Sequence, residues 1–377
     1  MTIGWTRLAL IIAGLAAGGL LFAWSGLFNV AATTGHWALT EWFLHWTMHN
    51  SVRTHALGIE PPPLADPALV HRGAGHYAAG CVPCHGAPGE PQSPIARELT
   101  PMPPRLGQRV HEWERKHLFW IVKHGVKYTG MPAWVAQSRD DEVWAMVAFL
   151  DRLPEMTPAE YRRLAYGPVA THQDAAGPSA GSAGPPPDVL SECARCHGRD
   201  GAGRHVGAFP ILSGQNETYL YNTLRAYARG SRHSGMMQPA ASGLDDATLR
   251  ALARHYARAA RRTAAPVAES ADIGRLRQGE RIAKRGAPRD LVPPCVSCHG
   301  PKAGPRFAAY PRLAGQHPGY LAQQLRLYKR DARGGTAFGP IMQMIAGNLS
   351  EAQIRAVTAY YGSLFRKTNK ALAEIER

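Results

Sequence analysis

The 377-residue chain is short of several residue types and patterns, and each shortage narrows what the protein can be. Acidic residues number only 28 against 43 lysines and arginines, which leaves a formal net charge of +15. No nucleic-acid-binding motif accompanies this charge, so a basic face is expected to meet anionic lipid or an acidic protein, unless it only keeps the surface soluble. No stretch has the alternating pattern of a β-strand, so we expect a helical protein.

Cysteine is also scarce, and its placement is the most informative feature of the chain. All six cysteines fall in three copies of the motif C-x-x-C-H, and none is left over. The copies are Cys81-Val82-Pro83-Cys84-His85, Cys193-Ala194-Arg195-Cys196-His197 and Cys295-Val296-Ser297-Cys298-His299. A zinc site would need four ligands from paired motifs, and a thioredoxin-like pair would need a βαβ unit and no histidine. Three copies, each followed directly by histidine, favour covalent attachment of c-type haem.

The chemistry of this attachment assigns a role to each residue of the motif. The two cysteines form thioethers with the two vinyl groups of one haem, and the next residue directs its imidazole at the iron. The sequence therefore predicts three covalently bound haem c groups. The predicted attachment residues are Cys81, Cys84, Cys193, Cys196, Cys295 and Cys298, and the predicted proximal ligands are His85, His197 and His299.

The residue on the other face of each iron determines whether the haem only transfers electrons or also binds ligands and catalyses reactions. A methionine or histidine closes the iron, whereas an open position binds ligands or catalyses a reaction, as in a peroxidase. In the first region Met131 lies 50 residues after Cys81, in a Gly-Met-Pro turn that exposes the sulfur; the alternative is a core methionine. Since every region offers a methionine, we expect no substrate at iron and no enzyme activity in the chain itself.

The second and third regions each offer two methionines, Met236 or Met237 and Met342 or Met344. An internal repeat distinguishes between them. Met237 lies seven residues before Leu244, as Met342 does before the corresponding leucine, whereas the other two methionines do not align. Met237 and Met342 are therefore the predicted ligands, 44 and 47 residues after the first cysteines of their motifs.

The repeat relates the second and third regions but not the first. At a constant offset of 101, Phe209-Pro210-Ile211-Leu212-Ser213-Gly214-Gln215 matches Tyr310-Pro311-Arg312-Leu313-Ala314-Gly315-Gln316, and Tyr219-Leu220 matches Tyr320-Leu321. The two regions are interpreted as one duplicated domain.

A proline recurs between motif and methionine in all three regions. A carbonyl near such a proline is expected to accept a hydrogen bond from the second ring nitrogen of the proximal histidine, unless the proline only shapes a loop. The prolines are Pro104, Pro210 and Pro311.

The one long hydrophobic run lies near the N-terminus. Residues 8–28 carry no charge and are long enough to span a bilayer as a helix. Arg7 precedes them, which places the short N-terminal side in the cytoplasm and the haem regions in the periplasm. We expect an anchor in the bacterial inner membrane; the alternative is a signal peptide cleaved near Ala31 and Ala32. Haem of the c type is attached outside the bacterial cytoplasm, which agrees with a retained anchor and with a cleaved signal peptide alike.

The next segment, 36–49, is rich in tryptophan and histidine. Three tryptophans and a phenylalanine are typical of a helix at a membrane interface. Its histidines are interpreted as interfacial or packed on a partner surface, with a metal or quinone site as the alternative.

Composition and periodicity divide the chain into regions. A tract rich in proline, glycine, alanine and serine, from about Gly167 to Pro187, is interpreted as a flexible linker, and 261–271 as a shorter junction. Helices are expected over Leu69–Ala79, Asp140–Leu150, Asp245–Ala257, Ile273–Lys284 and Ser350–Leu364. The predicted divisions are an anchor and interfacial segment at 1–62, haem domains at 63–155, 188–264 and 265–377, and a linker at 156–187.

Residues 65–366 resemble class I cytochrome c, three domains in a row. The last two regions are similar to the diheme cytochrome c4 family in their C-x-x-C-H-G motif, Phe/Tyr-Pro-x-Leu-x-Gly-Gln stretch and Tyr-Leu-x-x-x-Leu helix. In that family the methionine in this position binds iron, which implies Met237 and Met342. The first region resembles single-haem domains with a Gly-Met-Pro-Ala loop, found in respiratory cytochrome subunits. The resemblance implies a mainly α fold with three tandem class I cytochrome c domains after an N-terminal transmembrane helix.

Two functions are compatible with this reading. The first is a membrane-anchored triheme cytochrome that transfers electrons in a periplasmic respiratory chain, to or within a terminal oxidase complex. The alternative is the cytochrome c subunit of a membrane-bound periplasmic dehydrogenase, since such subunits are often triheme. The chain carries no flavin, quinone-cofactor or molybdenum signature of a catalytic subunit. In both cases its expected partners are the membrane and other redox proteins.

Overall fold

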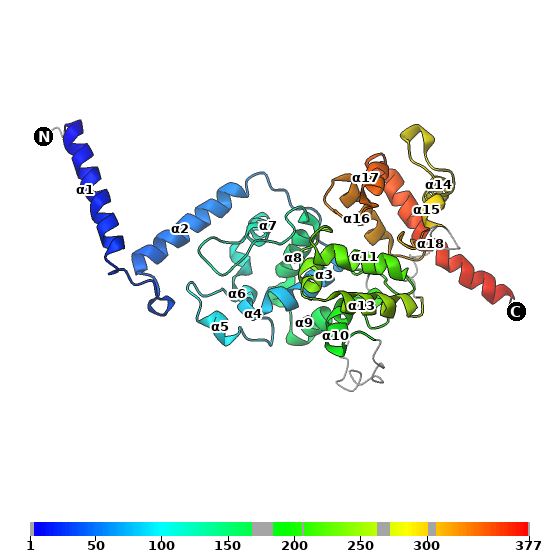
Figure 1. Cartoon of the computed structure of the whole chain (residues 1–377), viewed down its shortest axis with the longest axis horizontal. Helices are drawn as coiled ribbons and strands as arrows, with labels where there is room; N and C mark the ends of the chain where they lie inside the picture. Colours follow the sequence, from blue (N-terminus) through cyan, green and yellow to red (C-terminus); the bar gives the residue numbers. More distant parts are fainter. Residues whose placement is uncertain (1–3, 168–183, 206, 262–271, 301–306, 376–377) are drawn as a thin grey trace.

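The computed structural model describes residues 4–167, 184–205, 207–261, 272–300 and 307–375. These residues form helices and no β-strand, with only isolated bridges such as Arg232 with Gly334. The prediction of a mainly α protein is confirmed. Figure 1 shows most helices gathered in one body, from which α1 and α2 project at one end and the last part of α18 at the other.

The N-terminal segment consists of two helices. These are α1 (Trp5–Trp24) and α2 (Ala38–His55), with the 3-10 turn η1 (Ala32–Thr34) between them. α1 has no buried residue and is long and apolar enough to cross a membrane. α2 packs on α7 of the first haem region, where the rings of His49 and Trp113 stack with centroids 4.5 Å apart. His49 thus packs on an aromatic side chain of the same protein, which neither of the two sequence interpretations anticipates.

The first haem region is built around a close crossing of two helices. Its elements are α3 (Pro67–Gly80), α4 (Val82–His85), α5 (Pro94–Arg97), α6 (Leu106–Arg109), η2 (Val110–Glu112), α7 (Arg115–His124), α8 (Asp140–Arg152), η3 (Leu153–Glu155) and α9 (Pro158–Tyr166). α3 begins after Asp66, whose side chain accepts a hydrogen bond from the Ala68 N–H at 2.9 Å. Where α3 crosses α8, a Cβ on Gly73 would overlap the Ala145 carbonyl and Phe149. Glycine therefore permits the close approach.

Helix α9 lies inside the stretch 156–187 that the sequence predicts as linker. Its Tyr161 and Ala165 are fully buried in the core of the first region. The prediction was wrong at this point, because an amphipathic helix continues the first region to the end of α9. The rest of that linker, 168–183, and the predicted junction at 262–271 lie outside the described residues.

The second and third regions share a helical order. The second contains α10 (Pro187–His197), η5 (Gly203–His205), α11 (Glu217–Ala228), α12 (Met237–Ser242) and α13 (Asp246–Arg258). The third contains α14 (Ile273–Arg285), η6 (Pro288–Asp290), α15 (Val296–His299), α16 (Pro318–Lys329), α17 (Gly339–Gly347) and α18 (Glu351–Ile375). The Asp245 side chain caps α13 by accepting from the Thr248 N–H at 2.8 Å, and Ser350 and Gln353 form a capping box at the start of α18. The helices predicted at the ends of both regions are confirmed.

The third region repeats the helix crossing of the first. α14 packs on α18, and a Cβ on Gly279 would overlap the Ala356 carbonyl. In both the first and the third region, therefore, the helix that precedes the haem motif crosses a later long helix at a glycine. Tandem class I cytochrome c domains account for this recurrence.

The second and third regions meet across a pseudo-twofold interface. The Gln215 amide donates to the Arg312 carbonyl at 3.0 Å and accepts from the Arg312 N–H at 2.8 Å. Gln316 makes the same two bonds with the backbone of Ile211, both at 3.0 Å. Gln316 and Arg312 follow Gln215 and Ile211 by the repeat offset of 101. The duplicated regions therefore exchange equivalent contacts, as the subunits of an isologous dimer do.

Candidate haem sites

The first motif lies where α3 ends and α4 begins. The His85 N–H donates to the Cys81 carbonyl at 2.9 Å, so a single helical turn carries the motif. The Tyr77 hydroxyl donates to the Gly86 carbonyl at 2.6 Å and holds the end of this turn. His85 Nδ1 lies 2.8 Å from the Pro104 carbonyl oxygen. That hydrogen bond orients the ring and leaves Nε2 available to a metal.

The same bond recurs at the third motif but not at the second. His299 Nδ1 lies 2.9 Å from the Pro311 carbonyl oxygen. The Pro210 carbonyl lies beside His197 and raises its pKa, but burial outweighs it and lowers the pKa to about 4. Among the described residues His197 Nδ1 has no hydrogen-bond partner. The prediction of a prolyl-carbonyl partner is confirmed at the first and third motifs only.

A cavity of about 2260 Å³ runs through the first and second regions. Its walls include the whole predicted residue set of both regions, Cys81, Cys84, His85, Met131, Cys193, Cys196, His197 and Met237. Pockets for drug-sized molecules measure about 300–1,000 Å³. This cavity is large enough for two prosthetic groups, so the first and second candidate sites form one continuous space.

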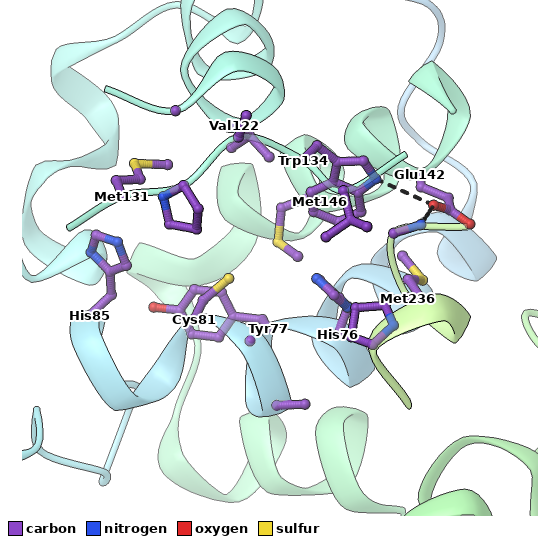
Figure 2. Close-up of a pocket in the computed structure, with 18 of the residues that line it drawn as sticks. His76, Tyr77, Cys81, His85, Val122, Met131, Trp134, Glu142, Met146 and Met236 are labelled. Atoms are coloured by element: carbon purple, nitrogen blue, oxygen red, sulfur yellow. Dashed lines mark hydrogen bonds between the residues drawn. The ribbon is translucent and has the colours of Figure 1, made fainter. Parts of the chain in front are cut away.

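The methionine of the first region belongs to a turn held by Thr129. The Thr129 hydroxyl donates to the Val126 carbonyl at 2.7 Å and accepts from the Met131 N–H at 3.1 Å. Figure 2 shows Met131 and His85 at the same end of the cavity, on opposite walls. The fully buried Met146 of α8 also lines this space. The sequence analysis missed Met146 because its helical spacing is that of a core residue.

In the second region the two methionines differ in their surroundings. Met236 and Met237 stand at the start of α12, and both line the cavity. Met236 packs against the hydrophobic core of the first region. This contact engages Met236 with another domain and favours Met237 as the iron ligand, in agreement with the repeat.

The third motif lies on α15, with His299 only 8% exposed. An aromatic series connects this ring to the residue before α17: His299 to Tyr310 at 6.1 Å and Tyr310 to Phe338 at 5.2 Å between ring centroids. On α17 Met344 is 66% exposed, whereas Met342 is half-buried. The burial of Met342 favours it over Met344, because an iron ligand in a closed haem site is shielded from water.

The cysteines fit haem attachment better than the two alternatives. None of the six forms a disulfide, and burial raises the pKa of the Cys81 thiol to about 12 and of the Cys193 and Cys295 thiols to about 11. Thioredoxin-like reactivity depends on a lowered thiol pKa. Across the described ranges no group of three or more His, Cys, Asp or Glu side chains is arranged to hold a metal ion. The paired thiols, the adjacent histidines and the large cavity fit covalently bound haem.

Helix α3 contributes to the first and second sites together. A Cβ on Gly75 would lie 3.1 Å from Cys196 Sγ and 3.4 Å from the Phe209 ring. The neighbouring His76 lines the cavity, with its ring centroid 4.7 Å from that of Trp134, and burial lowers its pKa to about 4. No motif in the sequence indicates that Gly75, His76 and Trp134 take part in a wall of the cavity, because folding alone brings them to it.

Comparisons with known proteins agree with this geometry. Residues 68–150 match the family described as cytochrome C oxidase, cbb3-type, subunit III, and residues 289–364 match the cytochrome c family. The chain is 32% identical over 185 residues to a thiosulfate dehydrogenase electron acceptor of Thiomonas intermedia, covering 49% of this chain and 83% of the relative. It is 35% identical over 179 residues to the protein of that name in Stutzerimonas stutzeri, covering 46% and 80%. It is 32% identical over 196 residues to cytochrome c4 of Azotobacter vinelandii, covering 49% and 90%.

The fold, the motifs and the cavity define a multihaem c-type cytochrome, which binds haem c and transfers electrons. The chain belongs to the class I cytochrome c family and contains domains like those of the diheme cytochrome c4 proteins.

Proposed function

We propose that the chain is a membrane-anchored triheme cytochrome that transfers electrons in a periplasmic respiratory chain, to or within a terminal oxidase complex. The observation that carries the proposal is the continuous cavity of the first and second sites, beside a third region that duplicates the second. Haem supplies an iron that alternates between the ferrous and ferric states. Adjoining haems in such an arrangement form a path along which electrons move through the protein.

The side chains of this chain hold the haems and exclude water. The six motif cysteines would form the thioethers to haem, and His85, His197, His299, Met131, Met237 and Met342 would supply nitrogen and sulfur ligands to the irons. The carbonyls of Pro104 and Pro311 orient the first and third imidazoles. Methionine opposite histidine raises the reduction potential, which suits the high-potential end of a respiratory chain. With both faces of each iron covered, the chain carries electrons and is not itself an enzyme.

The N-terminal segment supports an anchor in the inner membrane, with the haem regions in the periplasm. α1 is apolar and exposed along its length. α2 then exposes an aromatic cluster consisting of Trp37, Trp42, Phe43 and Trp46, each at least 51% exposed. Aromatic rings of this kind prefer the membrane–water interface. The cluster would hold the first haem region close to the membrane surface.

The family match of the first region and the named relatives favour different electron-transfer partners. The first region matches a family described as an oxidase subunit, which supports a terminal oxidase as electron acceptor. The relatives named thiosulfate dehydrogenase electron acceptor favour the alternative, in which a periplasmic dehydrogenase donates electrons to the duplicated regions. Purification of the full chain in mild detergent, followed by identification of co-purifying subunits, separates the two. Oxidase subunits support the main proposal, a dehydrogenase alone supports the alternative, and a chain recovered free of both contradicts membership of either complex.

Binding of carbon monoxide tests whether each iron has a methionine as its sixth ligand. The reduced protein is expected to hold three haems per chain by pyridine haemochrome assay and to bind almost no carbon monoxide. A Met131→Ala variant opens the first iron and should bind one equivalent, which shows that the assay detects an open site. Ready binding to the unaltered protein would contradict methionine ligation at the site concerned.

A further inference from the structure

A buried carboxylate joins the first haem region to the second. Glu142 lies on α8, and its side chain is 6% exposed. One oxygen accepts from the Ser234 hydroxyl at 2.6 Å, and the other accepts from the Gly235 N–H at 2.6 Å and the Trp134 indole N–H at 3.3 Å. Arg139 Nη2 lies 3.0 Å from the first oxygen. The buried charge is therefore both paired and hydrogen-bonded, as a buried ion must be to persist.

All three donors belong to loops that carry proposed iron ligands. Trp134 ends the first ligand loop, residues 131–134, and the other two donors begin the second ligand loop, residues 234–237. The Ser234 hydroxyl also accepts hydrogen bonds from two N–H groups of its own loop, at 3.3 and 3.1 Å, the second being that of Met237. A series of hydrogen bonds thus leads from a carboxylate of the first region to the backbone of the proposed ligand in the second.

The two ligand loops also touch where they meet this carboxylate. A Cβ on Gly235 would overlap the indole nitrogen of Trp134. Figure 2 shows Trp134 and Glu142 at the end of the cavity away from His85, with the hydrogen bond between them dashed. Arg139 adds a further bond, from Nη1 to the His233 carbonyl at 2.6 Å. Neither loop can therefore move at this point without disturbing the other.

The third region has no counterpart of this arrangement among the described residues. At the start of α17, the helix that carries Met342, the Gly339 N–H donates to the backbone carbonyl of Thr336 at 2.8 Å, whereas at the start of α12 the Met237 N–H donates to the Ser234 hydroxyl. The third region lines the cavity shared by the first two sites through Tyr320, Gln323 and Gln324 of α16, but not through α15 or α17, which carry its haem motif and Met342. The third site therefore serves as an internal reference for any change at the other two.

We propose that Glu142 is a positioning residue that fixes both ligand loops, so that methionine binding at the first and second irons is coupled while the third iron is independent. The inference rests on the proposed function, in which Met131 and Met237 are the sixth ligands. The second loop donates two of the three hydrogen bonds to the carboxylate, including the one from the Ser234 hydroxyl that continues to Met237. Loss of the carboxylate should therefore weaken methionine binding most at the second iron, less at the first and not at the third.

The test compares the full-length holoprotein with its Glu142→Gln variant, using imidazole as a probe that competes with methionine for ferric iron. A hydrogen bond to a charged group is worth roughly tenfold or more in an equilibrium constant. The affinity of the second haem for imidazole should rise about tenfold or more. The hyperfine-shifted methionine methyl resonances of the ferric protein, assigned through single replacements of the three ligands, identify the haem concerned. An Asp151→Asn variant is the control, since Asp151 lies on the same helix and pairs with Arg115 at the surface.

A Ser234→Ala variant provides a second route if Glu142→Gln fails to fold. It removes the hydroxyl between the carboxylate and the Met237 N–H and leaves the first region intact, so only the second haem should gain affinity for imidazole. Unchanged affinities at all three haems, or equal changes at all three, would overturn the role of Glu142. Failure of the proposed function is distinct, because the unaltered protein would then lack three haems or their methionine-to-iron charge-transfer absorption.

Discussion

The interface between the second and third regions differs in kind from the interface between the first and second. The former is pseudo-symmetric: Gln215 and Gln316, equivalent in the repeat, each bond the backbone of the opposite region. The latter is asymmetric and depends on single features, the carboxylate of Glu142 and the glycine contacts at Gly75 and Gly235. The residues of the pseudo-symmetric interface recur in the sequence at the repeat offset, so the repeat points to them. The residues of the asymmetric interface occur once, and no sequence pattern points to them.

Buried arginines extend this contrast. Arg232 and Arg333 are separated by the repeat offset and are 3% and 6% exposed. Each lies over a tyrosine ring of its own region, at 4.7 and 4.3 Å from the centroid, and both bond to Gln324 Oε1, at 3.2 and 2.7 Å. At the asymmetric interface the buried arginine is Arg139, which pairs with carboxylates instead. The interface between the second and third regions thus brings two arginine charges together. At the interface between the first and second regions, the charge of the single arginine is neutralised by carboxylates.

The largest effect is expected from replacing the proposed ligand at the asymmetric interface. Met237→Ala should abolish the methionine-to-iron charge-transfer absorption of one haem, because an iron without its sixth ligand opens to solvent. Met236→Ala is the matched variant and should keep that absorption, since Met236 packs on the first region. Optical spectra of the ferric proteins measure both. The reverse result would assign the ligand to Met236 and remove the agreement with the repeat.

A smaller effect is expected from adding one methyl group between the two ligand loops. Gly235→Ala directs a Cβ into Trp134 and should lower the free energy of unfolding by up to about 3 kcal/mol, the upper end for overpacking. Gly243→Ala, where nothing lies within 4 Å of the added Cβ, should change it by no more than about 0.5 kcal/mol. Guanidinium unfolding followed by circular dichroism measures both values. Equal stabilities would mean that the first and second regions do not pack as described.

The symmetric interface should respond equally from its two sides. Gln316→Ala removes two hydrogen bonds to Ile211 and should lower the free energy of unfolding by about 1–3 kcal/mol, since each bond contributes roughly 0.5–1.5 kcal/mol. Gln215→Ala removes the equivalent pair and should cost the same. Unfolding free energies of the two variants and of the double variant provide the measurement. Clearly unequal costs would contradict the pseudo-twofold relation.

The smallest effect is expected at an ion pair away from both interfaces. Arg326 binds Glu351 at 2.8 Å, but the side chains are 41% and 51% exposed. Arg326→Gln should therefore change the unfolding free energy by less than about 1 kcal/mol, and the difference should shrink with added salt. Unfolding at low and high ionic strength checks this. A larger, salt-independent cost would indicate that this surface is buried in an assembly.

Much of the fold could be predicted because its signals are local. The helices expected before the motifs and at the region ends form as predicted, since apolar periodicity and caps such as Asp245 act within a few residues. The linker was predicted too long because α9 is short and adjoins the tract rich in proline, glycine, alanine and serine, and because it is stabilised by burying Tyr161 in the core of the first region. Local composition cannot report that contact.

The candidate sites divide in the same way. The attachment cysteines, the proximal histidines and the choice of Met237 follow from spacing and repetition, because covalent haem attachment needs its residues within one helical turn. His76, Trp134 and Glu142 were missed, since none belongs to a repeated pattern. His76 meets Trp134 only through folding, and Trp134 and Glu142 contact the Ser234–Gly235 segment of the second region.

By itself the sequence determined the c-type motifs, the duplication and the helical class, because these depend on residues that are close along the chain. Only the tertiary structure decided that the first and second sites share one cavity and that a carboxylate of one region holds the ligand loop of the next. The physical reason is that burial, pairing of a charge and contact between loops are properties of surfaces brought together by folding. Residues 142 and 234 are far apart in the chain, and no pattern along it records that they touch.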